Sequence, residues 1–430
     1  MRLNLLLIGV TLVPCLTACS GRSDEFGVVA KAGTRTATTG TKQPNAGCTP
    51  LERRLPEVAD QKPAFPEQTR ACELTDSVDF DVTVVAKGLK NPWAVEPLPD
   101  GSLLVTEKPG RMRIISASGV VGEPLAGIPA VDARGQGGLL DVELSPRFAV
   151  DRMIYWSFAE PRQGGNATSI ARGTLSADNR RVENVKVIYQ TMPVYDGDKH
   201  FGSRLAFGPD GMLYVTLGER SDTPMRPQAQ RLDSDLGKVL RLAADGSIPL
   251  DNPFAERTDA RPAIWSLGHR NIQSAAFDNE GQLWIVEHGT RGGDELNRVE
   301  RGKNYGWPLQ AYGKEYSGQL PISSTAGSAR TQVDGMEQPV YFWDPVIAPS
   351  GAQWYSGDAF PAWKNSLFVG DMKSGRLTRL TLTGNRVTGE QVMLEDRNQR
   401  VRDVRQGPDG ALFVVTDESD GELWRITPRR

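Results

Sequence analysis

The only three histidines of this chain, His200, His269 and His288, each lie in a stretch rich in glycine and charged residues. An imidazole has an ordinary pKa of about 6.5, so it can take up or release a proton near neutral pH. A single histidine in such a place is more often a hydrogen-bonded structural residue. Three of them in comparable loops favour a shared site where proton transfer could take place.

Cationic side chains lie beside one of these histidines and in two later loops. If these loops converge, the positive charges repel one another unless an anion lies between them. A small ligand with several carboxylates or phosphates would balance that charge. Taken one at a time, the same side chains are also compatible with solvated charges at a rim. They are Arg270, Lys373, Arg400 and Arg402.

A segment rich in glycine and acidic residues, residues 289–295, offers carbonyl and carboxylate oxygens. A donor set made only of oxygen suits Ca²⁺ rather than Zn²⁺. The alternative is that Asp294 and Glu295 cap a turn.

A repeated clause predicts the elements that would position these residues. Pro-Asp-Gly-x-Leu-x-Val occurs at residues 99–105, 209–215 and 408–414, with a looser copy at 279–285. Residues 153–156 and 366–369 keep only the strand, which makes six copies. The four fuller copies read as a turn and an alternating strand, and each of the six copies is followed by a second strand with a full or weaker Gly-x-apolar-x-Arg-apolar pattern. Six such units predict an all-β fold, a six-bladed β-propeller. The early strand at residues 80–85 is expected to pair into the last blade and close the ring.

Composition divides the sequence into three parts. Residues 1–18 have a positive start and a short apolar run, and with Cys19 they resemble a bacterial lipoprotein signal. Acylation of Cys19 would anchor the protein in the periplasm, and Ser20 favours the outer membrane. Residues 19–77 have the composition of a disordered linker and contain Cys48 and Cys72, which we expect to be paired. Residues 78–430 form the propeller domain. The net charge of −3 gives no electrostatic reason to expect nucleic acid as a partner.

Several of these motifs together resemble the soluble pyrroloquinoline-quinone (PQQ) aldose sugar dehydrogenases of the glucose/sorbosone dehydrogenase family. The resemblance runs in order from about residue 82 to residue 428. Its motifs are the stretch around His200, Arg270-Asn271, residues 289–295, residues 304–308 and residues 400–404.

The resemblance implies a role for each matching position. His200 matches the general base, Glu219 matches the acidic residue that orients it, and Arg270 matches a residue that stabilises charge on the quinone. The carbonyls of Gly289 and Thr290 match ligands of a Ca²⁺ that also touches PQQ. Glu295 and Tyr305 match a second, structural Ca²⁺ site. The residues that match the PQQ pocket are Gln136, Arg270, Asn271, Tyr316, Asp371, Met372, Lys373, Arg400 and Arg402.

Two positions depart from the family pattern. Thr290 stands where proline is usual, which removes the rigidity that proline gives to a loop. His269 replaces a bulky apolar or aromatic residue, and it could touch the sugar entrance or only pack.

The resemblance implies oxidation of an aldose at the anomeric carbon to a lactone. No Cys-x-x-Cys-His motif for haem attachment occurs in the sequence, so the electrons would pass to an external acceptor. A metal-dependent lactonase-type hydrolase on a six-bladed propeller is the alternative activity, although such a site would not need a ring of cations. A propeller that binds a protein or glycan without catalysis is the third possibility.

Overall fold

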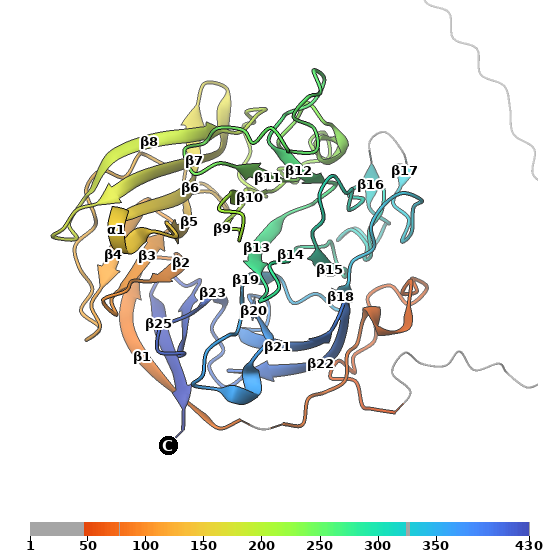
Figure 1. Ribbon diagram of the computed structural model, residues 1–430. Helices are drawn as coiled ribbons and strands as arrows, with labels where there is room; N and C mark the ends of the chain where they lie inside the picture. The colour runs from red at the N-terminus through yellow and green to blue at the C-terminus, as the bar shows by residue number, and fades with distance from the viewer. Residues whose placement is uncertain (1–46, 77, 324–326, 430) are drawn as a thin grey trace, which may run out of the picture. The chain divides into compact units, whose positions relative to one another are not determined.

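Six antiparallel sheets of three or four strands surround a central axis in the computed structural model, which describes residues 47–76, 78–323 and 327–429 (Figure 1). From the axis outward, blade 1 has β2 (Pro92–Pro97), β3 (Leu103–Glu107) and β4 (Arg111–Ile115); blade 2 has β5 (Leu139–Leu144), β6 (Met153–Arg162), β7 (Gly165–Leu175) and β8 (Val182–Gln190); blade 3 has β9 (Gly202–Phe207), β10 (Leu213–Leu217), β11 (Lys238–Leu242) and β12 (Ile264–Leu267). Blade 4 has β13 (Ile272–Phe277), β14 (Leu283–Glu287), β15 (Asp294–Arg298) and β18 (Tyr341–Trp343); blade 5 has β19 (Pro349–Trp354), β20 (Leu367–Asp371), β21 (Arg376–Thr383) and β22 (Arg386–Met393); blade 6 has β23 (Val401–Gln406), β24 (Leu412–Thr416), β25 (Gly421–Pro428) and β1 (Phe80–Leu89). The prediction of an all-β, six-bladed propeller is confirmed.

The ring closes as the sequence predicts. β1 is the outermost strand of blade 6 and pairs antiparallel with β25, with Val82 opposite Ile426 and Val84 opposite Trp424. One sheet therefore joins the two ends of the propeller, and no blade is left at a free end of the ring. The innermost strands β2, β5, β9, β13, β19 and β23 each contact the next one around the axis.

The repeated clause forms the turn that leads into the second strand of blades 1, 3, 4 and 6. Gly101, Gly211 and Gly410 have φ angles of 82°, 73° and 78°, which glycine adopts without the steric cost that a Cβ would bring. The aspartate before each glycine accepts the backbone N–H two residues farther on, as in Asp100 with Ser102 at 2.9 Å. The strands that follow, β3, β10 and β24, are buried at every residue.

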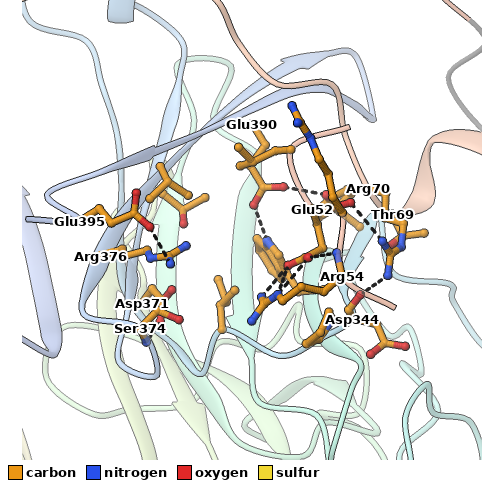
Figure 2. Close-up of a pocket in the computed structure, with 18 residues that line it drawn as sticks. Glu52, Arg54, Thr69, Arg70, Asp344, Asp371, Ser374, Arg376, Glu390 and Glu395 are labelled. Carbon is orange, nitrogen blue, oxygen red and sulfur yellow. Dashed lines mark hydrogen bonds and ion pairs between the residues drawn. The ribbon is translucent and has the colours of Figure 1, made fainter. Parts of the chain in front are cut away.

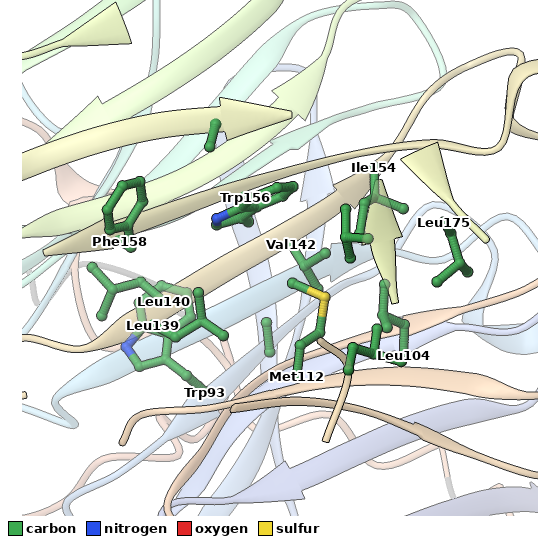
Figure 3. Packing of buried hydrophobic residues seen from close by; sticks show 14 of the residues in the cluster. Trp93, Leu104, Met112, Leu139, Leu140, Val142, Ile154, Trp156, Phe158 and Leu175 are labelled. Atoms are coloured by element: carbon green, nitrogen blue, oxygen red, sulfur yellow. The ribbon is translucent and has the colours of Figure 1, made fainter. Parts of the chain in front are cut away.

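The hydrophobic core lies between the faces of neighbouring blades. Between blades 1 and 2, Leu104 and Met112 pack with Val142 and Trp156, all of them fully buried (Figure 3). Helical segments are short: η1 (Pro66–Gln68), α1 (Phe148–Asp151), η2 (Arg226–Gln230) and η3 (Pro361–Trp363). A two-stranded hairpin, β16 (Ile322–Ser323) with β17 (Gly327–Ser328), lies outside the blades' own sheets.

Residues 48–76, here called the arm, differ from the linker that their composition predicts. A disulfide joins Cys48 to Cys72, and the arm packs along blades 4 and 5. The signal segment and Cys19 lie outside the described residues. Among the residues that are described, no helix has the length and apolar character needed to cross a bilayer.

Candidate active site

A cavity of about 280 Å³ opens at one end of the propeller axis. Every blade contributes to its wall, because the innermost strands and their loops converge there. The lining residues include Trp93 of blade 1, Gln136 before blade 2, Gly202 of blade 3, Gln273 and His288 of blade 4, Met372 of blade 5, and Arg400 and Arg402 of blade 6.

His200 and Glu219 form a buried pair that does not itself line this cavity but lies next to residues that do. The Nδ1 atom of His200 lies 2.7 Å from Oε2 of Glu219, and both side chains are almost completely buried. The Oε1 atom of Glu219 has no hydrogen-bond partner among the described residues. The backbone N–H of His200 donates to the side-chain oxygen of Gln136 at 2.8 Å, and Phe201 and Gly202 line the cavity. The sequence placed these residues at one site, and the structure brings them together.

Burial and charge leave the pair as a neutral imidazole beside an ionised carboxylate. Burial lowers the pKa of His200 below its ordinary 6.5, which Glu219 opposes and Arg270 reinforces. Burial alone would raise the pKa of Glu219, but its interaction with His200, together with the charge of Arg270, brings it below the ordinary value. With Nδ1–H donated to the carboxylate, Nε2 carries the lone pair that can accept a proton.

Arg220 fixes the loop that carries His200, and the sequence analysis did not identify it. Its buried guanidinium donates to the carbonyls of Lys199 and Gly197 and to the Oδ1 atom of Asn166. It also lies 4.1 Å from the centre of the Phe201 ring. Its only sequence signal is its position directly after Glu219.

Only two of the four cations expected to converge, Arg400 and Arg402, line the axial cavity. Arg402 is buried in the cavity wall, where its guanidinium stacks on Trp93 at 4.4 Å and contacts Gln273 and Met372. Burial lowers the pKa of Arg402 to about 10, and no carboxylate in the described part of the chain lies within ion-pair distance of it. Arg400 also lines the cavity and pairs with Asp417 at 3.3 Å.

The other two cations lie outside this cavity. Arg270 lies behind His288, where its guanidinium donates to the His288 carbonyl at 3.1 Å and stacks on Trp307. Its Nε atom is buried and has no hydrogen-bond partner among the described residues. Lys373 is exposed. Tyr316, also expected in the pocket, is 80% exposed and does not line the cavity.

In the turn after β20, neighbouring side chains point to different sides of the propeller wall. Met372 faces the axial cavity, whereas the Asp371 carboxylate accepts the backbone N–H groups of Lys373 and Ser374 and faces the arm. Burial raises the pKa of Asp371 to about 6. Asp371 therefore shapes the turn and does not itself line the predicted cofactor pocket.

A second, small cavity lies beside Gly289 and is lined by oxygen-bearing residues. Glu287, Glu295 and Tyr305 all border it. Burial and the neighbouring charge of Glu287 raise the pKa of Glu295 well above its ordinary value. The buried Oγ1 of Thr290 and Oδ1 of Asn297 have no hydrogen-bond partner within the described ranges. Arg270 also borders this cavity, whereas Thr290 and Asn297 are not among the residues that line it. The carboxylates of Glu287 and Glu295 are oxygen donors of the kind that Ca²⁺ prefers.

The ligand set of such a cation would depend on backbone carbonyls. No group of three or more His, Cys, Asp or Glu side chains is placed to hold a metal in the part of the chain that the structure describes. The phenol of Tyr305 is already bonded to the Arg298 carbonyl at 2.6 Å, which leaves its own carbonyl as the ligand that the resemblance implies. The carboxylate of Asp294 is likewise occupied, by the N–H groups of Gly289, Ile347 and Ala348.

The remaining histidines have structural contacts. His269 is fully buried between Ser266 and Glu287, at 2.9 Å from each, and stacks on Tyr305, so it packs and does not reach a sugar entrance. His288 lines both cavities and contacts the Pro349 carbonyl at 2.8 Å and Asn271 at 3.4 Å. Burial lowers the pKa of His288 to about 3, which keeps it neutral. The Oδ1 atom of Asn271 in turn accepts the N–H of Gly202.

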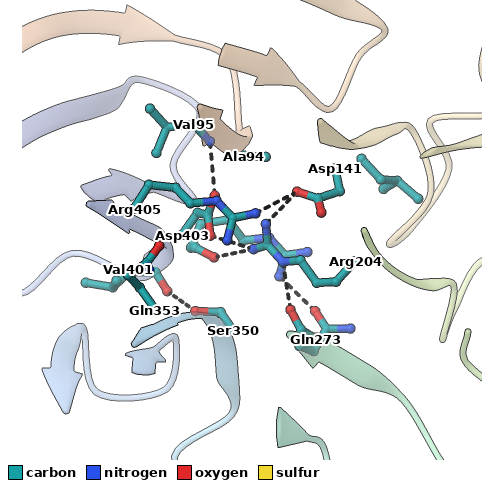
Figure 4. Close-up of polar contacts among 12 residues, drawn as sticks. Ala94, Val95, Asp141, Arg204, Gln273, Ser350, Gln353, Val401, Asp403 and Arg405 are labelled. Carbon is teal, nitrogen blue, oxygen red and sulfur yellow. Dashed lines mark hydrogen bonds and ion pairs between the residues drawn. The ribbon is translucent and has the colours of Figure 1, made fainter. Parts of the chain in front are cut away.

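An ion-pair cluster lies on the axis beside the cavity (Figure 4). Arg204 is 1% exposed and bonds to Asp141 at 2.7 Å and to Asp403 at 2.9 Å. It also stacks on Trp93, the same indole that Arg402 contacts. The sequence analysis assigned no role to Arg204 or to its two partners, although Asp403 lies within the motif at residues 400–404.

The fold and site define a class: a six-bladed propeller with a buried imidazole–carboxylate pair next to an axial cavity. The cavity is lined by Arg402, which has no carboxylate partner among the described residues. A family model described as Glucose / Sorbosone dehydrogenase matches residues 89–425. The chain belongs to this family of oxidoreductases.

Relatives of this chain agree in sequence and in structure. Aldose sugar dehydrogenase YliI of Escherichia coli (strain K12) is 44% identical over 352 residues, which are 81% of this chain and 93% of that protein. The crystal structure of the soluble aldose sugar dehydrogenase from Escherichia coli in the apo-form has a TM-score of 0.78 at 43% identity, covering 82% of this chain and 100% of the other. The PQQ-bound aldose sugar dehydrogenase from Streptomyces coelicolor has a TM-score of 0.65 at 29% identity, covering 81% and 99%.

Proposed function

We propose that this protein is a PQQ- and Ca²⁺-dependent aldose sugar dehydrogenase that oxidises the anomeric carbon of its substrate to a lactone. The observation that carries the proposal is the buried His200–Glu219 pair, which lies next to Gln136 and Phe201 of an axial cavity lined by Arg402. PQQ carries three carboxylates, and a buried guanidinium without a carboxylate partner is suited to such a ligand. The PQQ-bound relative supports the same cofactor.

The chain's own residues bind the reactants and move one proton. Arg402, Arg400, Gln136 and Met372 line the cavity and would hold the cofactor. His200 takes the proton of the anomeric hydroxyl on Nε2, and Glu219 holds the imidazole in the required tautomer and stabilises the imidazolium that forms. PQQ, when bound, supplies the acceptor for the hydride that leaves the anomeric carbon.

Two cation positions follow from the oxygen donors. The carbonyls of Gly289 and Thr290 would hold one Ca²⁺, which supplies Lewis-acid stabilisation of negative charge on the cofactor. Glu295 and the Tyr305 carbonyl would hold a second one, with a structural role.

The decisive experiment reconstitutes the metal-free, cofactor-free protein with PQQ and Ca²⁺ and follows dye reduction with glucose and other aldoses. We expect reduction only when PQQ, Ca²⁺ and sugar are all present. Absence of quinone-dependent reduction with every aldose tested would contradict the proposal. Lactone hydrolysis without quinone would instead support the hydrolase alternative.

Replacing Arg402 by methionine is expected to weaken PQQ binding by about 10–100-fold, because a hydrogen bond to a charged group contributes ~1.5–3 kcal/mol. Lys373→Met should have a smaller effect, since its exposed ammonium must first be ordered to reach the cofactor. Fluorescence titration of the apo-protein with PQQ measures both affinities. Equal affinities for wild type and Arg402→Met would contradict the cavity assignment.

The acid limb of the pH–rate profile should lie below the ordinary imidazole value of 6.5, because burial lowers the pKa of His200. The neutral imidazole is the active base, so kcat/KM should be level above that pKa and should fall as the pH drops through it. In Glu219→Gln the carboxylate that opposes this lowering is removed, and the limb should move to lower pH still. An acid limb above neutrality would contradict the assignment of His200 as the base.

We also propose that acylated Cys19 anchors the enzyme in the periplasm, at the outer membrane, and that its electrons pass to an external acceptor. Cys19→Ser is expected to move the protein from the membrane fraction to the soluble fraction without changing turnover. Fractionation of cells, with fatty-acid labelling of the wild-type chain, tests this. Equal membrane retention of the variant would contradict the anchor.

A further inference from the structure

The arm, residues 48–76, precedes the region that the family model matches, which begins at residue 89. It contacts two segments of blade 4 that lie beside the proposed Ca²⁺ position. One is the loop of residues 289–293, here called the carbonyl loop. The other is residues 312–314, here called the partner segment.

Gln61 of the arm holds the partner segment by its backbone. The N–H of Gly313 donates to Oε1 of Gln61 at 2.6 Å, and Nε2 of Gln61 donates to the carbonyl of Gly313 at 3.1 Å. One amide side chain thus satisfies both backbone groups of one residue, as a neighbouring strand would do.

Glu57 of the arm holds both segments at once. Its Oε2 lies 2.7 Å from Nε of Arg291 in the carbonyl loop. Its backbone carbonyl accepts Nζ of Lys314 at 2.5 Å, and its N–H donates to Asp344 at 2.9 Å. The carboxylate of Glu57 therefore places a charge between Arg291 and Lys314, with Lys314 at 3.9 Å.

The partner segment and the carbonyl loop are joined to each other through their backbones. Arg291 donates to the Lys314 carbonyl at 2.7 Å, and Lys314 donates back to Arg291 at 3.0 Å. The contact is tight at the glycines, since a Cβ on Gly313 would come within 2.2 Å of the Gly292 carbonyl. Displacement of the partner segment must therefore move the loop that contains Gly289 and Thr290.

The arm itself is fixed to the propeller by the residues around Cys72, and its Cys48 end is paired with this same segment. Leu74 donates to the Glu390 carbonyl, and Glu390 donates to the Cys72 carbonyl, so the arm extends the edge of β22. Arg70 donates to the Asp344 carbonyl at 2.9 Å, and Figure 2 shows Glu52, Arg54 and Arg70 over this face of the propeller. Gln68 bonds to the Pro339 carbonyl and to the phenol of Tyr312.

We propose that the arm is a clamp that positions the carbonyl loop for Ca²⁺, and that Glu57 and Gln61 are its positioning residues. The role of the metal rests on the proposed function. The rigidity of the carbonyl loop does not, because the contacts between arm, partner segment and loop are made by the protein alone. The disulfide keeps the arm closed and so contributes to the same rigidity.

Hydrogen exchange and calcium binding on the full chain test the clamp in two independent ways. In the metal-free protein, Gln61→Ala and Glu57→Gln should raise the exchange rates of the Arg291 and Gly293 amides by about tenfold. Neither amide donates to the arm, since Arg291 donates to Lys314 and Gly293 donates to Trp343. Isothermal titration with Ca²⁺ should show about fivefold weaker binding. Cys48→Ser with Cys72→Ser should have a larger effect on both.

Arg53→Ala is the matched control, because Arg53 lies on the arm in an exposed pair with Glu73, away from the carbonyl loop. It should leave both readouts unchanged. The proposal is overturned if Gln61→Ala and Glu57→Gln speed exchange only within the arm and at residues 313–314, with Arg291, Gly293 and Ca²⁺ affinity as in wild type. If the wild-type protein binds no Ca²⁺, the metal part of the proposed function fails, and the exchange of Arg291 and Gly293 still decides the clamp.

Discussion

Replacing His200 by alanine is expected to leave PQQ binding within about twofold of wild type and to lower aldose turnover by about 10²–10⁴-fold. The variant removes the imidazole that accepts the proton, whereas Arg400 and Arg402 in the cavity wall make no contact with it. Dye-reduction kinetics measure the turnover, and fluorescence titration measures cofactor binding. Lys199→Ala is a suitable control, since Lys199 is the exposed neighbour of His200 and should retain full activity.

The Glu219→Gln variant separates positioning from charge in the same pair. The amide oxygen of glutamine can still accept Nδ1–H, so the tautomer is kept, but the carboxylate that stabilises the imidazolium is lost. Turnover should therefore fall less than in His200→Ala, by about 10–100-fold.

Two outcomes would contradict the role of His200. Wild-type turnover in His200→Ala would show that His200 is not the general base. Loss of PQQ binding together with turnover would show that the imidazole is structural.

The propeller could be predicted because its signals are local. A turn with glycine at positive φ and an alternating strand recur within a few residues of each other, and each copy formed a blade. The arm could not be predicted in the same way. Its bridge from Glu73 to Glu390 joins residues far apart in sequence, and the arm's composition is that of a linker.

The site was predictable where a residue's role depends on its position in a motif. Glu219 contacts the His200 imidazole, as the resemblance implies, and Gln136 lines the cavity and accepts the N–H of His200. Side-chain direction within a turn was not predictable. Lys373 and Met372 are neighbours in sequence, but the turn closed by Asp371 directs Met372 to the cavity and leaves Lys373 exposed. Of the four cations expected to meet around one ligand, the structure places Arg400 and Arg402 in the lining of the axial cavity, and Arg270 and Lys373 outside it.

The axial cluster was missed for a different reason. In an alternating strand, a charged residue is ordinarily assigned to a solvated face. Arg204, Asp141 and Asp403 lie on innermost strands, where that face is turned to the axis and buried. Only the convergence of blades 2, 3 and 6 makes their charges complementary, and that convergence is a property of the closed ring.

Replacing Arg204 by methionine is expected to lower the free energy of unfolding by about 3–5 kcal/mol, because it leaves two buried carboxylates without their main cation. Asp141 also lies 3.7 Å from Arg405, which still balances part of its charge. The expected loss of stability is therefore smaller than for two buried carboxylates with no cation nearby. Urea denaturation followed by tryptophan fluorescence measures the loss.

Arg425→Met, which breaks the surface pair with Asp409, is the matched control and should lower the free energy of unfolding by about 0–1 kcal/mol. Adding Asp141→Asn and Asp403→Asn to Arg204→Met should recover part of the stability, since the unpaired charges are then removed. A loss in Arg204→Met no larger than that in Arg425→Met would show that the axial cluster does not hold the blades together.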